Sequence, residues 1–185
     1  MSRKMLMYVA FASLAAGSLA LQAKAQEEAY TADLQTSKTM STQTRVQIRI
    51  TKWCTQDEIK QYGAVLKDKG QPALLDALKN LDAGRINKVG DTGTQIAIAE
   101  KWQNGDKTVI TLILARPMSM FETRSRGQST KYPFSFLQIT VDGSGKGTGK
   151  LVENAGIKYD QEKDTYKLDP FGQGPRVLNN VKPLK

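Results

Sequence analysis

The chain has 185 residues, with 27 Lys or Arg against 18 Asp or Glu and a net charge of +9, and it contains one cysteine and no histidine. The absence of histidine excludes Ser-His-Asp and Cys-His catalysis and the usual histidine-containing zinc sites. A single cysteine, Cys54, cannot form an internal disulfide, so the folded chain has to be stabilised by its core.

The N-terminal 25 residues have the pattern of a cleavable signal peptide. Residues 1–4 carry two basic side chains and precede an uncharged apolar run at 5–21, and Ala23 and Ala25 supply the small residues that signal peptidase requires. A retained N-terminal anchor is the alternative, although the run is short for a membrane span. We expect export to the periplasm or secretion, a mature chain that begins at Gln26, and no transmembrane helix after cleavage.

The mature chain is the size of one domain. Cleavage leaves 160 of the 185 residues, and removing three of the 27 basic residues leaves 24 against 18 acidic ones, a net charge of +6. This excess fits a solvated cationic surface, or attraction to anionic lipid, cell-wall polymer or nucleic acid. Residues 26–44 are polar and predict a flexible lead-in, so that a single β-rich domain occupies 45–185.

The first ordered elements are a strand and two helices. Residues 45–53 alternate apolar and polar side chains through Val46, Ile48 and Ile50, as a half-buried strand does. Thr55 and Glu58 form a capping box that predicts a helix up to Gly70. A second helix follows from Pro72 to about Gly84, so the sequence predicts a helical hairpin with its turn at 69–70.

The remainder of the chain has the pattern of strands. The residues 94–102 alternate through Ile96 and Ile98, and the residues 107–115 are apolar on both faces, as in a core strand. Between them Asn104-Gly105 is a strong hairpin signal. The other strand segments are 85–89, 131–142, 150–152, 156–159, 166–168 and 176–181. We therefore expect an α+β fold, mostly antiparallel β: a sandwich or partly closed barrel of about seven or eight strands with one N-terminal helical hairpin.

The glycine-rich segment 143–149 invites comparison with a phosphate-binding loop. Its spacing lacks the Gly, four residues and Gly-Lys-Ser/Thr of that motif, and it joins two strands rather than a strand and a helix. A hairpin turn is the better interpretation. Lys146 also stands where a calcium loop needs an oxygen ligand, so the segment does not predict a metal site.

The segment 116–132 between two strands is the densest candidate for a binding surface. Its candidate ligand-binding residues are Arg116, Glu122, Arg124, Arg126 and Tyr132. Arginine side chains suit carboxylate, phosphate or sulfate groups, and loops held by a scaffold often carry binding groups. The alternative is structural, with Glu122 paired to Arg124 or Arg126 and the loop covering an open end of the sheet.

Several segments resemble a group of uncharacterised exported bacterial proteins. They are the run Ile50-Thr-Lys-Trp53-x-Thr55-x-x-Glu58, the leucine-rich segment 73–81, the Arg116-Pro-x-Ser-x-x-Glu122-x-Arg124 segment with Tyr132-Pro-Phe134, and the ending Val177-Leu-x-Asn-Val181. The resemblance spans most of 45–181 and implies a leader, a helical pair and a β-rich remainder. It implies no activity and no site residue.

The sequence favours an exported, non-enzymatic binding or interaction domain. It predicts no catalytic residue, no metal site and no cofactor, and no nucleic-acid partner is expected; the partner is unknown, with an anionic ligand or an envelope component as candidates. One alternative is a hydrolase or lyase that uses Glu122 with Arg124 and Arg126. Another is an envelope-associated basic protein that binds anionic polymer or lipid through its net charge.

Overall fold

The computed structural model describes residues 8–9, 27–35, 43–116, 131–171 and 174–184. They form one helix and eleven strands, which are β1 (Tyr8–Val9), β2 (Glu28–Gln35), β3 (Gln43–Ile50), α1 (Gln56–Leu78), β4 (Gly84–Lys88), β5 (Thr94–Ile96), β6 (Ile98–Asn104), β7 (Lys107–Leu114), β8 (Phe134–Val141), β9 (Gly147–Asp160), β10 (Thr165–Pro170) and β11 (Arg176–Pro183). The predicted class, mostly antiparallel β with a helical element, is confirmed. Of the expected leader only the two residues of β1 are described, so the leader remains a prediction.

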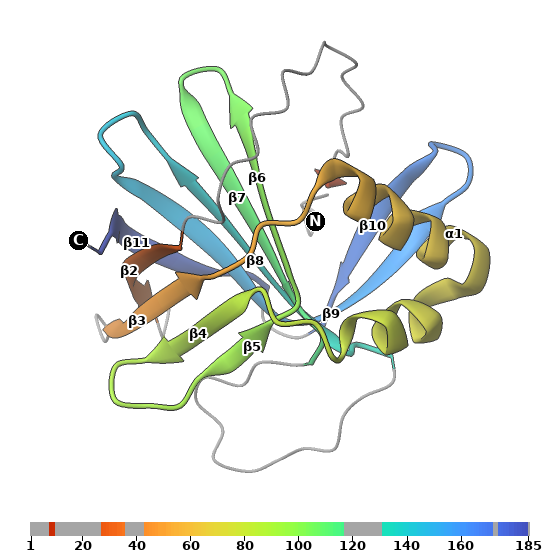
Figure 1. The fold of residues 1–185 in the computed structure, drawn as a ribbon, viewed down its shortest axis with the longest axis horizontal. Coiled ribbons are helices and arrows are strands. Elements are labelled where there is room, and N and C mark those ends of the chain that lie inside the picture. Colours follow the sequence, from red (N-terminus) through yellow and green to blue (C-terminus); the bar gives the residue numbers. More distant parts are fainter. Residues whose placement is uncertain (1–7, 10–26, 36–42, 117–130, 172–173, 185) are drawn as a thin grey trace, which may run out of the picture.

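The strands form one antiparallel sheet that curls into a nearly closed barrel (Figure 1). Its order is β5-β4-β3-β2-β11-β9-β8-β7-β6, with β10 paired to β9 and β1 paired to β10. The two ends of this order, β5 and β6, are consecutive in the chain and are separated only by Ala97. The Ala97 N–H donates to the carbonyl of Ile113 at 2.8 Å, so the chain passes directly from pairing with β4 to pairing with β7.

The predicted flexible lead-in at 26–44 is wrong over the residues 28–35, because these form β2 in the middle of the sheet. β2 pairs with β3 on one side and with β11 on the other. Tyr30, Ala32 and Leu34 alternate into the barrel, and Leu34 is fully buried. Since β2 has neighbours on both sides, backbone pairing and inward-facing side chains of only moderate size suffice to order it.

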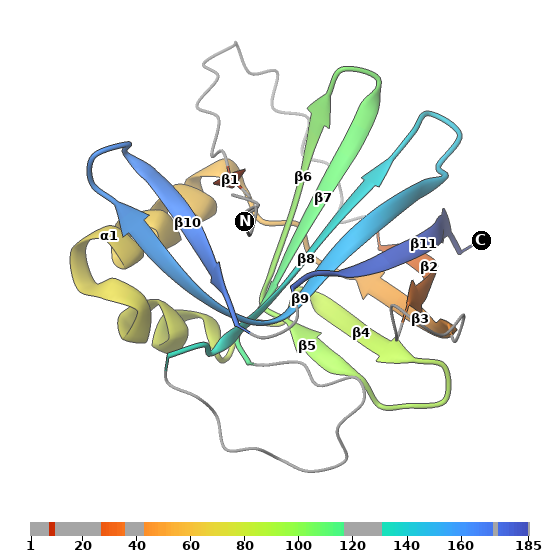
Figure 2. The ribbon, with the colours of Figure 1, turned by 180° about the vertical axis from the view of Figure 1, so that it is seen from behind.

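The apolar side chains form two separate layers. The first fills the barrel interior with residues from every part of the barrel wall, among them Leu34, Ile48, Ile86, Ile110, Leu112, Leu137, Ile139, Leu151 and Leu178. The second lies between the outer face of β6–β9 and α1. In Figure 1 the helix lies beside β9 and β10, on the opposite side of the molecule from β2–β4, and Figure 2 shows β9 running from the barrel into its hairpin with β10. The sheet is thus buried on both faces along β7 and β8.

The helix α1 begins as the capping box predicts and is interrupted where the turn was expected. The Thr55 side chain accepts a hydrogen bond from the Glu58 N–H, and a carboxylate oxygen of Glu58 accepts one from the Thr55 N–H at 2.8 Å. Gly70 has φ 78° and ψ −178°, so the regular helix stops there and resumes at the following residues. The two segments make the bent α1 of Figure 1. Because φ is positive at this position, glycine is the residue best suited to the break.

The glycine-rich segment 143–149 is the turn between β8 and β9, which confirms the hairpin interpretation. The Asp142 carboxylate accepts hydrogen bonds from the Ser144 hydroxyl and from the N–H groups of Ser144 and Lys146. These bonds, the Ser144 hydroxyl first, hold the pKa of Asp142 below its ordinary value. The aspartate at this turn is therefore explained by turn chemistry.

Two glycines of this turn provide a matched test of the packing. A Cβ at Gly147 would lie 2.0 Å from the carbonyl oxygen of Thr140, whereas one at Gly143 would have no heavy atom within 4 Å. We expect Gly147→Ala to lower the free energy of unfolding by at least about 2 kcal/mol, because the β8–β9 pair has to separate. Gly143→Ala should change it by less than about 0.5 kcal/mol. Urea unfolding of both variants measures this, and equal effects would contradict the close approach of β8 and β9.

Candidate functional site

Two of the five candidate residues of the predicted basic loop, Arg116 and Tyr132, are described, and each has its own structural partners. The Arg116 guanidinium donates from Nη2 to Oγ1 of Thr94 at 3.1 Å, which ties this residue to β5. The Arg116 carbonyl lies 2.9 Å from the hydroxyl of Ser135, a fully buried residue of β8. Both contacts hold the chain at the end of β7, so Arg116 has a packing role. Glu122, Arg124 and Arg126 lie outside the described residues, and their proposed role stays a prediction.

Tyr132, at the other end of that loop, belongs to an aromatic pair. Its ring stacks on Phe171 with 4.7 Å between centroids, and Lys131 Nζ lies 5.4 Å from the centroid of the Tyr132 ring. Phe171 is 61% exposed, and its N–H donates to the Asn154 carbonyl at 2.9 Å. The pair therefore joins the start of β8 to the end of β10, and a binding role for Tyr132 together with Arg116 stays a prediction.

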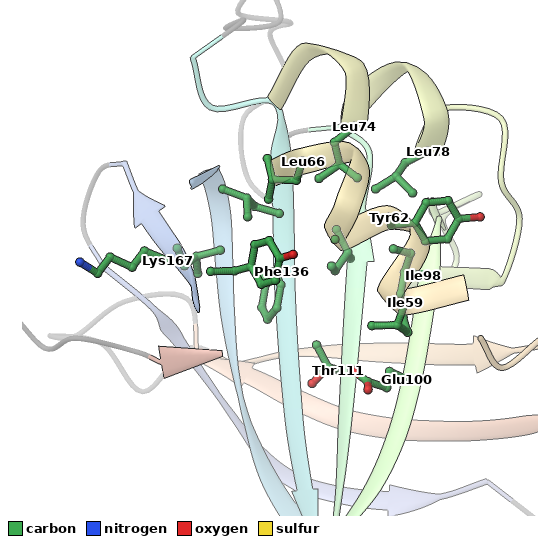
Figure 3. A pocket seen from close by; sticks show the side chains of 15 residues that line it. Ile59, Tyr62, Leu66, Leu74, Leu78, Ile98, Glu100, Thr111, Phe136 and Lys167 are labelled. Carbon is green, nitrogen blue, oxygen red and sulfur yellow. The ribbon is translucent and has the colours of Figure 1, made fainter. Parts of the chain in front are cut away.

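A different feature, which the sequence did not predict, is an apolar cavity of about 40 Å³ between α1 and the outer face of the sheet (Figure 3). From α1 it is lined by Ile59, Tyr62, Gly63, Leu66, Leu74 and Leu78. Leu66 precedes the break at Gly70 and Leu74 follows it, so both segments of the helix cover the cavity. A cavity of this size holds a short alkyl group or a few small atoms, and a larger ligand enters only if the cavity walls move apart.

The floor of the cavity follows from the strand register. Ile98 of β6 is directly opposite Ile113 of β7, which is directly opposite Phe136 of β8, and all three belong to the outer apolar layer. One step along the strands, Glu100 of β6 is directly opposite Thr111 of β7. Directly opposite residues share a face of the sheet. The floor is therefore apolar along one row, and it ends at a polar pair that Figure 3 shows together at one end of the cavity.

The hairpin of β9 and β10 makes the remaining wall. It contributes Ile157, Tyr166, Lys167 and Leu168. A Cβ at Gly63 of α1 would lie 2.6 Å from the Tyr166 hydroxyl oxygen, so the absence of a side chain at Gly63 allows this hydroxyl to reach the helix. Burial raises the pKa of Tyr166 and of Tyr62 above the ordinary value. Both phenols are thus neutral at physiological pH.

Gln71, directly after the break in α1, fixes the helix to the sheet beside the cavity. Its Oε1 accepts a hydrogen bond from the Ile157 N–H at 2.8 Å, and its Nε2 donates to the Lys131 carbonyl at 3.2 Å. These two bonds use backbone groups next to the irregularity where β9 leaves its regular register with β8, between Phe134 and Phe136. Gln71 is the first residue after the break at Gly70. Its two hydrogen bonds therefore fix α1 to the sheet at the point where the helix is interrupted.

Cys54 lies at the edge of this outer layer. It is partly buried, packs against the apolar cluster under α1, and its N–H donates to the Ala99 carbonyl at 2.8 Å. Burial raises the pKa of its thiol above the ordinary value. A thiol that is largely protonated is a poor nucleophile, so a packing role for Cys54 is supported.

Comparisons of the chain with known protein families, with curated proteins and with solved structures found no significant match. Among the residues that the structure describes, no three His, Cys, Asp or Glu side chains come together in a way that could hold a metal ion. None of the helices in those parts of the chain is long and apolar enough to cross a membrane.

The contact between Gly63 and Tyr166 can be tested by a double-mutant cycle. Helix propensity alone would make Gly63→Ala stabilising by about 0.5–1 kcal/mol. We expect it instead to destabilise the chain by about 1 kcal/mol, because the new methyl group overlaps the Tyr166 hydroxyl. In a Tyr166→Phe background the loss should shrink by at least about 0.5 kcal/mol. Thermal unfolding of the four proteins measures the coupling, and additive effects would show that α1 and β10 are not packed in this way.

Proposed function

We propose that this protein is an exported, non-enzymatic binding domain that takes a small apolar group into the cavity between α1 and the outer face of β6–β9. The observation that supports this most directly is the cavity itself. Protein interiors are normally packed without such voids, and each one removes dispersion contacts from the side chains that line it. A ligand that fills the cavity restores those contacts, and this gives the cavity a function.

The surroundings of the cavity support reversible binding rather than a rigid core. The interior of the barrel is filled by its own side chains, whereas the outer layer is closed by a helix that is interrupted at Gly70. Leu74 and Leu78 lie on the second segment of α1, beyond the break. Gln71 anchors the start of that segment to the sheet, and the part beyond the anchor takes no part in strand pairing, so an outward movement of Leu74 and Leu78 widens the cavity while the sheet stays intact. The fold therefore separates the part that maintains stability, the barrel, from the part that admits a ligand.

The alternatives retained from the sequence gain less support. A hydrolase or lyase would need a second carboxylate that faces Glu122, and Glu122 lies outside the described residues. An envelope-associated basic protein would need a cationic surface free to bind polymer. Several of the surface cations are already paired with carboxylates, for example Arg45 with Asp33 and Lys158 with Asp169. Export itself is expected from the leader pattern.

Binding of a small apolar molecule is tested with two leucine variants of α1. Leu66 lines the cavity, whereas Leu75 packs against the same cluster and does not line it. We expect benzene or n-hexanol to raise the melting temperature of the wild-type chain and of Leu75→Phe, because a ligand that binds only the folded state stabilises it. Leu66→Phe fills the cavity and should abolish the shift.

The melting temperatures without ligand serve as the control for this comparison, because both variants have to fold before their ligand responses are compared. A ligand shift that persists in Leu66→Phe would place binding elsewhere. No shift for either probe in the wild-type chain would refute the proposed function.

A further inference from the structure

The charges around the cavity are not balanced. Two of its lining residues are charged, Glu100 and Lys167. Lys167 forms an ion pair with Asp160, and in Figure 3 its ammonium group points away from the cavity. Glu100 forms no ion pair within the described parts of the chain, and its Oε1 accepts one hydrogen bond, from Gln56 Nε2 at 3.2 Å. The one carboxylate at the cavity is therefore without a counter-charge from those residues.

The neighbour of Glu100 across the sheet is a second polar residue. Thr111 is directly opposite Glu100, is only 4% exposed and lines the same cavity. Its hydroxyl is not one of the fully buried side-chain atoms that lack a hydrogen-bond partner among the described residues. A hydroxyl group both donates and accepts hydrogen bonds. A carboxylate and a hydroxyl thus adjoin one end of an otherwise apolar space.

The other charged groups nearby do not neutralise Glu100. Lys101 follows it on β6, and successive residues of a strand point to opposite faces. Its ammonium forms an ion pair with Glu28 at 2.5 Å and lies 4.7 Å from the centroid of the Trp53 ring. Lys52, which lies before α1, is paired with Glu58 at 3.0 Å. The cations closest in sequence and space therefore have partners of their own.

We propose that the cavity binds a small amphipathic amine, with its alkyl or aryl group among the apolar side chains and its ammonium group on the Glu100 carboxylate. The Thr111 hydroxyl accepts a second hydrogen bond from the same ammonium group. This inference rests on the proposed function and names the class of ligand. It differs from the anionic ligand that the basic loop suggested, because among the described residues that line the cavity the charge without an ion-pair partner is negative.

The sign of the charge decides between ligands of equal apolar size. An ammonium group gains a hydrogen bond to Glu100 in which both partners are charged, whereas a carboxylate is repelled by Glu100 and an alcohol brings no charge of its own, so that its affinity depends far less on the charge at this position. The three probes n-hexylamine, n-hexanol and hexanoate contain six carbon atoms each and differ in the charge of their polar group. Their order of affinity therefore reports on the polar end of the cavity, and their similar alkyl chains report on the apolar part.

The test is isothermal titration of the full chain with these three probes at pH 7 and low salt. We expect n-hexylamine to bind at least about tenfold more tightly than n-hexanol, and hexanoate to bind most weakly. Glu100→Gln should remove the preference for the amine and leave hexanol binding unchanged. Glu162→Gln, which makes the same change of charge in the exposed turn between β9 and β10, is the matched control and should leave all three affinities unchanged.

The outcomes separate this inference from the proposed function. If hexanol and hexylamine bind equally and Glu100→Gln has no effect, the amine inference is wrong and the apolar site stands. If none of the three probes binds, the proposed function is wrong as well. Thr111→Val is a second variant of nearly the same shape, and it should weaken hexylamine binding several-fold without weakening hexanol binding. An unchanged hexylamine affinity in Thr111→Val together with Glu100→Gln would overturn the placement of the ammonium group.

Discussion

The packing of α1 against the outer face of β6–β9 is the constraint on which the rest of the structure depends. β7 carries Ile110, Leu112 and Leu114 on its inner face and Ile113 on its outer face, and all four are buried. A sheet that is apolar on both faces has to be covered on both, because exposed strands of this composition associate with other chains. The barrel covers one face by closing on itself. The helix covers the other, together with the hairpin of β9 and β10.

Two local irregularities allow this arrangement. At the junction of β5 and β6, Ile96 belongs to the barrel interior, the next two residues both belong to the outer layer, and Ala99 returns to the interior. Two successive residues on one face mean that the strand alternation is broken there, as in a β-bulge. β9 departs from regular pairing with β8 near its middle and continues into a hairpin with β10. The outer layer therefore has its own walls, and its small cavity lies among residues from six different elements.

Local signals in the sequence predicted local structure well. The capping box at Thr55 and Glu58 marks the start of α1, and Asn104-Gly105 marks the hairpin of β6 and β7, whose turn consists of Gly105, with φ of 63°, and Asp106. The apolar pattern of 107–115 predicted a strand that is buried on both faces, and β7 confirms it. Each of these depends on residues a few positions apart, where backbone geometry and capping chemistry act directly.

Features that depend on distant pairing were not predicted. β2 has small or polar side chains at many positions and is ordered by β3 and β11, the second of which lies near the other end of the chain. Ile96 and Ile98 alternate in sequence yet face different layers, since the bulge between them is fixed by hydrogen bonding to Ile113. The polar pair of Glu100 and Thr111 becomes visible only through the register of β6 and β7. The sequence predicts a binding surface at 116–132 because the charged residues there are adjacent in sequence. The residues that line the cavity are far apart in sequence and are brought together by the fold.

The central claim is that the ligand enters the layer under α1 and leaves the barrel interior unchanged. Methyl NMR of isoleucine-labelled protein titrated with n-hexylamine tests this most directly, because the two layers contain different isoleucines. The account predicts that the methyl signals of Ile59, Ile98 and Ile113 shift on titration, while those of the interior residues Ile48, Ile86 and Ile110 stay in place. Shifts confined to the interior set, or spread equally over both sets, would contradict it.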